Sequence, residues 1–235
     1  MTLQPSKLEI VSDTICPWCY VGKRHLEAAL SVLADEGLTF DVHWRPFQLN
    51  PDMPASGLDR RAYRSAKFGS WEKSQALDAQ VAAVAAADGL SLRHDLMQRT
   101  PNTIASHALV RLADDIGGPA LQDRVVEALF AGYFTEGRDI GSLEVLTQIG
   151  VGAGLDQGVV VEALADPARR AAVHADEQLA RSLHLNGVPS FVMDGRYLFS
   201  GAQPAGAMAR AFRIASAAAR QGMNNPTDAA HAKGD

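Results

Sequence analysis

The segment from Lys7 to Gly37 restricts the possible folds of this chain more than any other part of the sequence. Lys7 to Ser12 has the pattern of a β-strand, and apolar residues recur at helical spacing from Leu26 to Leu33, before Gly37. Between the two lies Cys16-Pro17-Trp18-Cys19, which contains the only two cysteines among 235 residues. The cysteines therefore lie where a strand is predicted to turn into a helix.

A second strand pattern follows this helix. From Leu38 to Trp44, apolar and polar residues alternate, as they do in a strand with one buried face. Strand, helix and strand in this order form a parallel unit with a right-handed crossover.

Two more strands are predicted near the other end of the chain. They are Val188–Met193 and Arg196–Ser200, and Asp194-Gly195 between them is a pair favoured in tight hairpins. Pro204 suits the first turn of a helix, which is predicted to run to about Gln221.

The middle of the chain has no strand pattern. Residues 58–185 are predicted to form several helices, separated by helix-breaking residues such as Gly117-Gly118-Pro119. We therefore predict an α/β fold with one split core, residues 1–57 and 186–221, that carries an all-helical insertion, residues 58–185. The polar stretch 222–235 lacks periodicity and is predicted to be a disordered tail.

The composition is that of an ordinary soluble protein, with 47% apolar residues, 21% charged residues and a net charge of −5. No lysine and arginine cluster supplies the attraction that nucleic acids or anionic membranes need. The longest apolar run, Val81 to Ala87, is far shorter than the roughly 20 residues that span a bilayer. Leu8 to Val11 is too short for a signal peptide. We expect a cytoplasmic protein without nucleic-acid or membrane partners.

The cysteine spacing indicates redox chemistry, because cytoplasmic proteins rarely keep disulfides for stability. At a helix N-terminus, free N–H groups and the helix dipole would stabilise the thiolate of Cys16. Cys19 lies one turn further along, where it can attack a mixed disulfide on Cys16. Cys16 is thus the expected solvent-facing nucleophile. Pro17 suits the first helical turn, and Trp18 offers an apolar surface beside the sulfur.

Zinc binding and an inert structural role are the two simpler explanations of the cysteines. A structural zinc site needs four ligands, and the nearest histidines, His25 and His43, fall within the helix and on the polar face of a strand. We expect no metal. The placement at a strand-to-helix turn favours redox chemistry over inert cysteines.

Four blocks of sequence match one known pattern. They are Ser12-Asp13 with Cys16 through Arg24, Trp44-Arg45-Pro46-Phe47 with Asn50-Pro51, Gly187-Val188-Pro189-Ser190-Phe191, and Gly201-Ala202-Gln203-Pro204. Their content and order resemble the FrnE-type branch of the DsbA family. The resemblance covers the chain to about residue 220.

This resemblance implies a thioredoxin-like core interrupted by a helical domain, with the substrate groove between the two. It implies a thiol–disulfide oxidoreductase or disulfide isomerase with Cys16, Cys19 and Pro189 as catalytic residues. Pro189 would be cis and face the cysteines, whereas the alternative is an ordinary proline at a strand start. The expected substrate-binding residues are Pro17, Trp18 and Val188, the last pairing its backbone with an extended substrate.

One position departs from the thioredoxin-like pattern. A buried acid often stands six residues before the first cysteine, and this chain has Ile10 there. Asp13 lies in the following loop, where we expect it to cap the helix. The alternative role for Asp13 is to transfer a proton to and from Cys19. If Asp13 does not do so, water can carry this proton.

Two other functions remain open at this stage. Kappa-class glutathione transferases and 2-hydroxychromene-2-carboxylate isomerases share the implied fold, but they typically have serine at the first position and lack the second cysteine. A redox-regulated chaperone or binding module would need an exposed apolar surface on the insertion. We expect thiol- or disulfide-containing proteins as substrates, no cofactor, and glutathione as a candidate redox partner. The oligomeric state is not predicted.

Overall fold

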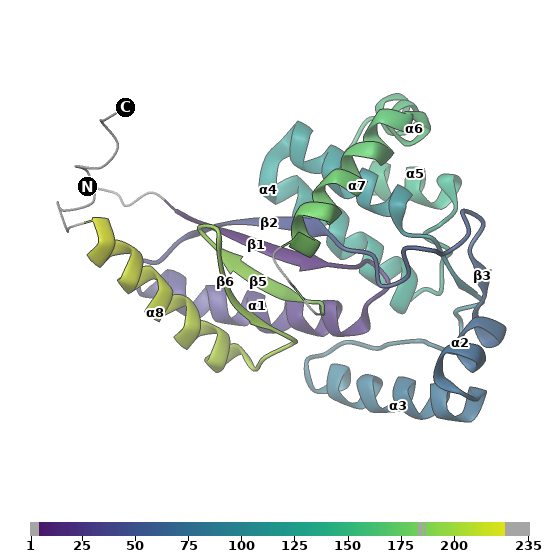
Figure 1. The fold of residues 1–235 in the computed structure, drawn as a ribbon, viewed down its shortest axis with the longest axis horizontal. Helices are drawn as coiled ribbons and strands as arrows, with labels where there is room; N and C mark the ends of the chain where they lie inside the picture. The colour runs from purple at the N-terminus through teal and green to yellow at the C-terminus, as the bar shows by residue number, and fades with distance from the viewer. Residues whose placement is uncertain (1–4, 183–184, 186, 224–235) are drawn as a thin grey trace.

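The computed structural model describes residues 5–182, 185 and 187–223. In chain order the elements are β1 Ser6–Ser12, α1 Pro17–Asp35, β2 Phe40–Pro46, β3 Leu58–Asp59, α2 Arg60–Phe68, α3 Trp71–Ala87, β4 Arg99–Thr100, α4 Ile104–Phe134, α5 Leu143–Gly152, α6 Gln157–Ala165, α7 Pro167–Ser182, β5 Ser190–Met193, β6 Arg196–Ser200 and α8 Ala205–Met223. Figure 1 shows α1 and α8 side by side along the sheet, with α2 to α7 gathered around one end of it and α4 and α7 against β2.

Four strands from the two ends of the chain form one mixed sheet in the order β2-β1-β5-β6. β1 pairs in parallel with β2 and antiparallel with β5, and Ile10 lies opposite both Trp44 and Phe191. β5 and β6 form the predicted hairpin, in which Asp194 and Gly195 have φ of 48° and 77°. The split α/β core with a helical insertion is therefore confirmed.

The central strand β1 is covered on both faces. Leu8 and Ile10 point to one face and join the main core, together with the buried face of α1. Val11 points to the opposite face and packs with Phe47 and with Ala180 of α7. This two-sided burial fixes the end of β1, from which the chain turns into α1 and its cysteines.

The outer edge of β2 is closed by a side chain of the insertion. Gln122 of α4 accepts a hydrogen bond from the backbone N–H of Trp44 at 2.8 Å and donates to its oxygen at 3.0 Å. A free strand edge would otherwise offer unpaired backbone groups. Gln122 thus joins the insertion to the core.

The insertion contains one short strand pairing, so the expectation of an all-helical segment is wrong at that point. Leu58 pairs with Thr100 and Asp59 with Arg99. Two-residue strands are too short to show an alternating pattern, which explains why the sequence did not reveal them. The pairing holds the start of α2 beside residues 97–100. The predicted helix break at Gly117-Gly118-Pro119 is confirmed, since Gly118, with φ of 62°, interrupts α4.

The helix predicted after Pro204 begins at Ala205 and runs to Met223, two residues further than expected. Of the predicted tail 222–235, residues 224–235 lie outside the described residues. No helix among the described parts of the chain is long and apolar enough to cross a membrane.

Candidate active site

Cys16 occupies the N-cap of α1, and Pro17 stands at the first helical position, as the sequence predicted. The backbone N–H of Cys16 donates to the oxygen of Asp13 at 3.0 Å, which closes the turn into the helix. Both cysteines are free thiols. The expectation of a solvent-facing Cys16 is wrong, because only 4% of Cys16 is exposed, and Cys19 is fully buried.

The Val188–Pro189 peptide bond is cis, as the resemblance implied. Sγ of Cys16 donates to the backbone oxygen of Val188 at 3.7 Å. The start of β5 therefore lies directly against the start of α1, although 172 positions separate the two residues.

Gly22, one turn beyond Cys19, permits this close approach. A Cβ atom at Gly22 would lie 3.0 Å from Cγ of Pro189 and 3.7 Å from Cα of Ala202. Glycine inside a helix is unfavourable relative to alanine, so a helical glycine against another element is a signal of backbone approach. Sequence reasoning included Gly22 in a matching block but assigned no role to it.

Access to Cys16 is through a cavity of about 430 Å3 between the core and the insertion. The core contributes Cys16, Pro17, Trp18 and Val188, so the predicted substrate-binding residues share one wall. Helices α2, α3 and α4 supply most of the remaining surface. Cys19 and Pro189 are not among the lining residues. Because 38% of Trp18 is exposed, its indole stands at the cavity mouth.

The opposite wall of this cavity is cationic. Arg60, Arg64 and Lys67 line it, and Asp78 is the one carboxylate among the lining residues that the structure describes. Asp78 binds Arg60 at 2.8 Å and Arg64 at 2.7 Å. Nη1 of Arg60 is buried without a partner in the described residues. Lys67 donates to Asn50 at 2.6 Å.

The environment of Cys19 opposes its ionisation. Burial raises the pKa of the Cys19 thiol well above its ordinary value, and the hydrogen bond with Cys16 and the charge of Cys16 raise it further. The carboxylate of Asp13 acts in the same direction, whereas the backbone N–H of Asp13 lowers the pKa. Cys19 therefore remains a protonated thiol near neutral pH.

Asp13 does not cap α1, so that expectation is corrected. The N-cap position has no side-chain hydrogen bond, and Oδ2 of Asp13 accepts the backbone N–H of Leu49 at 2.7 Å. Oδ1 of Asp13 lies 3.4 Å from Nε2 of His107, which begins the second turn of α4. Asp13 thus faces the insertion, away from the helix N-terminus.

Comparison with known proteins identifies the family of this chain. A family model for the DSBA-like thioredoxin domain matches residues 7–213. The chain belongs to the DsbA-like thioredoxin family. A crystal structure of a probable DsbA oxidoreductase, SCO1869, from Streptomyces coelicolor is 38% identical, with a TM-score of 0.80 and 90% of each chain covered. Assignment to the FrnE-type branch stays a prediction.

Two further proteins are similar to this chain. The uncharacterized protein YwbO of Bacillus subtilis is 27% identical over 79% of this chain and 86% of its own length. The cytosolic disulfide reductase DsbM of Pseudomonas aeruginosa is 22% identical, with a TM-score of 0.56 over 81% of this chain and 87% of that chain.

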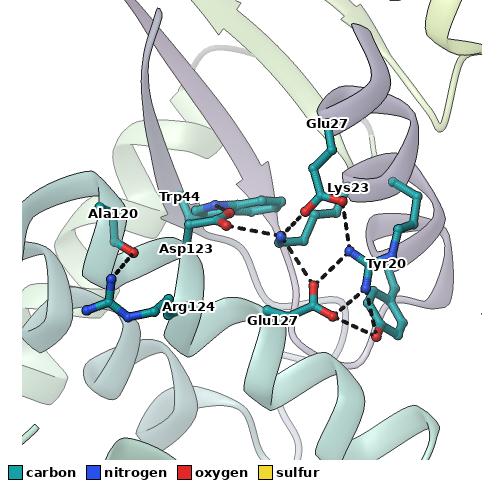
Figure 2. Close-up of polar contacts among 9 residues, drawn as sticks. Tyr20, Lys23, Glu27, Trp44, Ala120, Asp123, Arg124 and Glu127 are labelled. Atoms are coloured by element: carbon teal, nitrogen blue, oxygen red, sulfur yellow. Dashed lines mark hydrogen bonds and ion pairs between the residues drawn. The ribbon is translucent and has the colours of Figure 1, made fainter. Parts of the chain in front are cut away.

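In this DsbA-like chain, an ion network anchors α1 to α4 on the side shown in Figure 2. Nζ of Lys23, which is 2% exposed, lies 3.1 Å from Asp123 and 3.2 Å from Glu127 and also binds Glu27. Glu127 in addition accepts the Tyr20 hydroxyl at 3.0 Å and binds Arg24. The network fixes the helix that carries both cysteines relative to the insertion.

The described part of the chain contains no group of three or more His, Cys, Asp or Glu side chains arranged to hold a metal ion. Sequence reasoning missed two features of the site, the cationic wall and His107. Arg60, Arg64 and Lys67 recur at helical spacing, but this pattern is also typical of a solvated helix face.

Proposed function

We propose that this protein is a thiol–disulfide oxidoreductase or disulfide isomerase in which Cys16 is the nucleophile and Cys19 the resolving thiol. One observation carries the proposal: Cys16 caps α1, contacts Val188 beside the cis Pro189, and lines a cavity. The 38% identical relative described as a probable DsbA oxidoreductase supports the same chemistry.

The proposed reaction starts with the thiolate of Cys16, which the N-terminus of α1 stabilises. Its sulfur attacks one sulfur of a substrate disulfide, the substrate S–S bond breaks, and one substrate thiolate leaves. Cys19 then gives up its proton and attacks Cys16, the bond between Cys16 and the substrate sulfur breaks, and the Cys16–Cys19 disulfide forms. The second substrate sulfur leaves as a thiolate and takes up a proton. The substrate gains two electrons and the protein loses two. In reverse, a substrate thiolate attacks Cys16 of the oxidised protein, and a second substrate thiol completes the substrate disulfide.

We propose glutathione or a thiol of similar charge as the redox partner. Glutathione carries two carboxylates, and the cavity beside Cys16 has three cationic side chains against one carboxylate. Lys67 in particular makes its hydrogen bonds to the neutral partners Asn50 and Tyr63. Protein substrates would instead pair an extended segment with the backbone at Val188, next to the exposed Trp18.

The decisive experiment equilibrates the protein in glutathione buffers and measures the fraction of Cys16–Cys19 disulfide by mass spectrometry. A reversible two-electron transition, together with turnover in an insulin-reduction assay, is expected. The measured potential decides whether the protein makes, breaks or shuffles disulfides. Absence of any Cys16–Cys19 disulfide under strongly oxidising conditions would contradict the proposal.

The two alternative functions make different demands on the site. A glutathione-dependent isomerase or transferase needs no second cysteine, so replacing Cys19 by serine would leave its turnover intact. A chaperone or binding module has one feature in its favour, an apolar groove on α5 and α6 lined by the exposed Leu143, Val151 and Val161. Suppression of client aggregation without insulin reduction would favour that function.

A further inference from the structure

Both ring nitrogens of His25 on α1 face an oxygen that can only accept a hydrogen bond. Nδ1 lies 2.8 Å from the backbone oxygen of Gln203, and Nε2 lies 2.8 Å from Oδ2 of Asp88. A carbonyl oxygen and a carboxylate have no proton to donate. Both contacts are therefore hydrogen bonds only when His25 is an imidazolium, with a proton on each nitrogen.

These two contacts, called the His25 bridge below, join three parts of the fold. His25 belongs to the helix that carries the cysteines, Gln203 belongs to the turn between β6 and α8, and Asp88 is the C-cap of α3. Figure 1 shows the C-terminal end of α3 near the turn that leads into α8. The side chain of His25 is only 16% exposed, so the bridge is enclosed by the elements that it joins.

The turn before α8 is also attached to the cis proline. The N–H of Gly201 donates to the oxygen of Pro189 at 2.7 Å, and the N–H of Gln203 donates to the oxygen of Gly201 at 2.9 Å. The hydrogen bond from His25 thus fixes this turn on α1. Because the same turn binds Pro189, the bridge also fixes the start of β5, which contacts Cys16.

The contact with Asp88 holds a wall of the substrate cavity. Asp88 ends α3, and its carboxylate binds His25. Four residues of this helix line the cavity: Leu77, Asp78, Gln80 and Val81. The His25 bridge therefore connects the helix of the nucleophile to the cis-proline side of the site and to α3, between which a substrate must fit.

We propose that His25 is a positioning residue that, in its doubly protonated form, holds these elements in the arrangement that binds an extended peptide beside Cys16. The inference rests on the proposed function, because it concerns the same nucleophile and cavity. When the imidazolium loses a proton, one acceptor faces a bare ring nitrogen, and a charge-assisted hydrogen bond is lost. Histidine changes its charge between about pH 5 and 8, so peptide binding weakens over this interval.

Asp88 is the one charged partner of His25 in the part of the chain that the structure describes. Residues 81–92 and 201–204 contain no other charged side chain. The charged side chains within two positions of His25, and those in the first half of α8, are Lys23, Arg24, Glu27, Arg210 and Arg213. All of them form ion pairs with other residues except Arg210, which is exposed. None is a histidine, the side chain that titrates in this interval.

The test uses a peptide with blocked ends, no titratable side chain, and one cysteine in a mixed disulfide with thiopyridine. Cys16 of the reduced protein attacks the peptide sulfur, the S–S bond breaks, and thiopyridine leaves as an anion that takes up a proton to form the absorbing thione. Stopped-flow absorbance gives the limiting rate and the half-saturating peptide concentration, which measures binding when chemistry is slow. Dithiodipyridine, a small disulfide without a peptide backbone, is the second substrate.

The unmodified protein and His25→Gln should differ only where the bridge is charged. In the unmodified protein, the half-saturating peptide concentration is expected to rise about tenfold from pH 5 to 8, as the loss of one charge-assisted hydrogen bond predicts. Glutamine carries no charge, so His25→Gln should have the higher value at every pH. Both proteins should react equally fast with dithiodipyridine, because the thiol of Cys16 is unchanged.

Asp88→Asn distinguishes a charged bridge from a merely structural contact. The amide of asparagine can donate to a ring nitrogen, so a neutral imidazole then satisfies both contacts. The half-saturating concentration in this variant should therefore stay low and vary less than about threefold from pH 5 to 8. His43→Gln is the matched control: His43 on β2 contacts Asp114 through Nδ1 at 3.2 Å and is 20% exposed. It should keep the pH profile of the unmodified protein.

The proposal is overturned if peptide binding to the unmodified protein does not change with pH, whether or not the variants fold. It is also overturned if Asp88→Asn keeps the original pH dependence, or if His25→Gln binds the peptide at pH 5 as tightly as the unmodified protein. Equal slowing of peptide and dithiodipyridine in His25→Gln would indicate general distortion and has the same consequence. If Cys16 reacts with neither substrate, or no Cys16–Cys19 disulfide follows, the proposed function itself is contradicted.

Discussion

Sγ of Cys16 lies 3.7 Å from the backbone oxygen of Val188, the residue joined to the cis Pro189. The contact brings the first turn of α1 and the start of β5 to one point. Cys16 is open to the cavity and lies at the positive end of a helix, whereas Cys19 is fully buried with a raised pKa. The two sulfurs therefore have different environments, and they should react differently.

The first prediction concerns these unequal roles. Cys19→Ser removes the resolving thiol, so Cys16 should remain linked to its substrate, and mixed disulfides should accumulate on non-reducing gels. Cys16→Ser should lose exchange activity entirely, because the nucleophile is gone. Insulin reduction and mass spectrometry measure both effects. Alkylation at near-neutral pH followed by peptide mapping gives an independent check, with Cys16 modified first. Reductase turnover in Cys16→Ser would reverse the assignment.

The second prediction concerns the close approach at Gly22. Alanine there would place its Cβ 3.0 Å from Cγ of Pro189, tighter than ordinary contacts. Overpacking costs about 1–3 kcal/mol, which exceeds the about 0.5–1 kcal/mol that alanine gains over glycine in a helix. We expect Gly22→Ala to lower the free energy of unfolding by about 1 kcal/mol, and to lower turnover because Pro189 moves away from Cys16.

Gly206 provides the matched control, since it also lies in a helix, α8, and a Cβ atom there would meet only the flexible end of Arg210, at 3.9 Å. Gly206→Ala should therefore raise stability by about 0.5–1 kcal/mol and leave turnover unchanged. Opposite signs in the two denaturation experiments are the expected result. Equal stabilisation by both substitutions would show that Pro189 can move away from a Cβ at position 22 without loss of stability.

The third prediction concerns the cationic wall of the cavity. Lys67→Ala should raise the KM for glutathione disulfide severalfold and leave kcat nearly unchanged, because Lys67 would act in binding and not on the reacting sulfurs. Hydroxyethyl disulfide, which is neutral, should be reduced equally well by both proteins. The effect on glutathione disulfide should also diminish at high salt. An equal loss with both substrates would indicate distortion of the cavity.

Local sequence signals predicted the elements that carry the site. Cys16 at the start of a helix, the Asp194-Gly195 hairpin and the break at Gly118 each follow from the properties of adjacent residues. Such features need no knowledge of distant contacts. The fold of the core was therefore accessible from the sequence, and the resemblance supplied the cis state of Pro189.

Features that depend on distant contacts were not accessible in this way. His107 reaches Asp13 from 94 positions away, and nothing near either residue in the sequence indicates the other. Asp13 was expected to cap α1 because acids commonly cap helices, yet its carboxylate accepts a hydrogen bond from the backbone N–H of Leu49 instead. A tertiary contact, and not the local sequence, therefore determines which group the carboxylate of Asp13 binds.

The last prediction concerns the ion network of Figure 2 and its pH dependence. Although burial opposes ionisation, Arg24, Lys23 and Tyr20 lower the pKa of Glu127 below 4.5. A carboxyl group whose pKa is lower in the folded state stabilises the protein above its unfolded pKa, and this contribution is lost as the pH falls through the folded value. Glu127→Gln should thus reduce the free energy of unfolding by about 1–2 kcal/mol at neutral pH.

The difference between the original protein and Glu127→Gln should shrink as the pH falls below 4.5 and vanish below the lowered pKa of Glu127, where both side chains are uncharged. Urea denaturation at several pH values measures it, and acidic groups elsewhere contribute equally to both proteins and cancel. Glu162→Gln, a change on the exposed surface of α6, is the control and should give a pH-independent difference near zero. A constant deficit for Glu127→Gln at every pH would mean that Glu127 stabilises the junction of α1 and α4 through packing, and not through its charge.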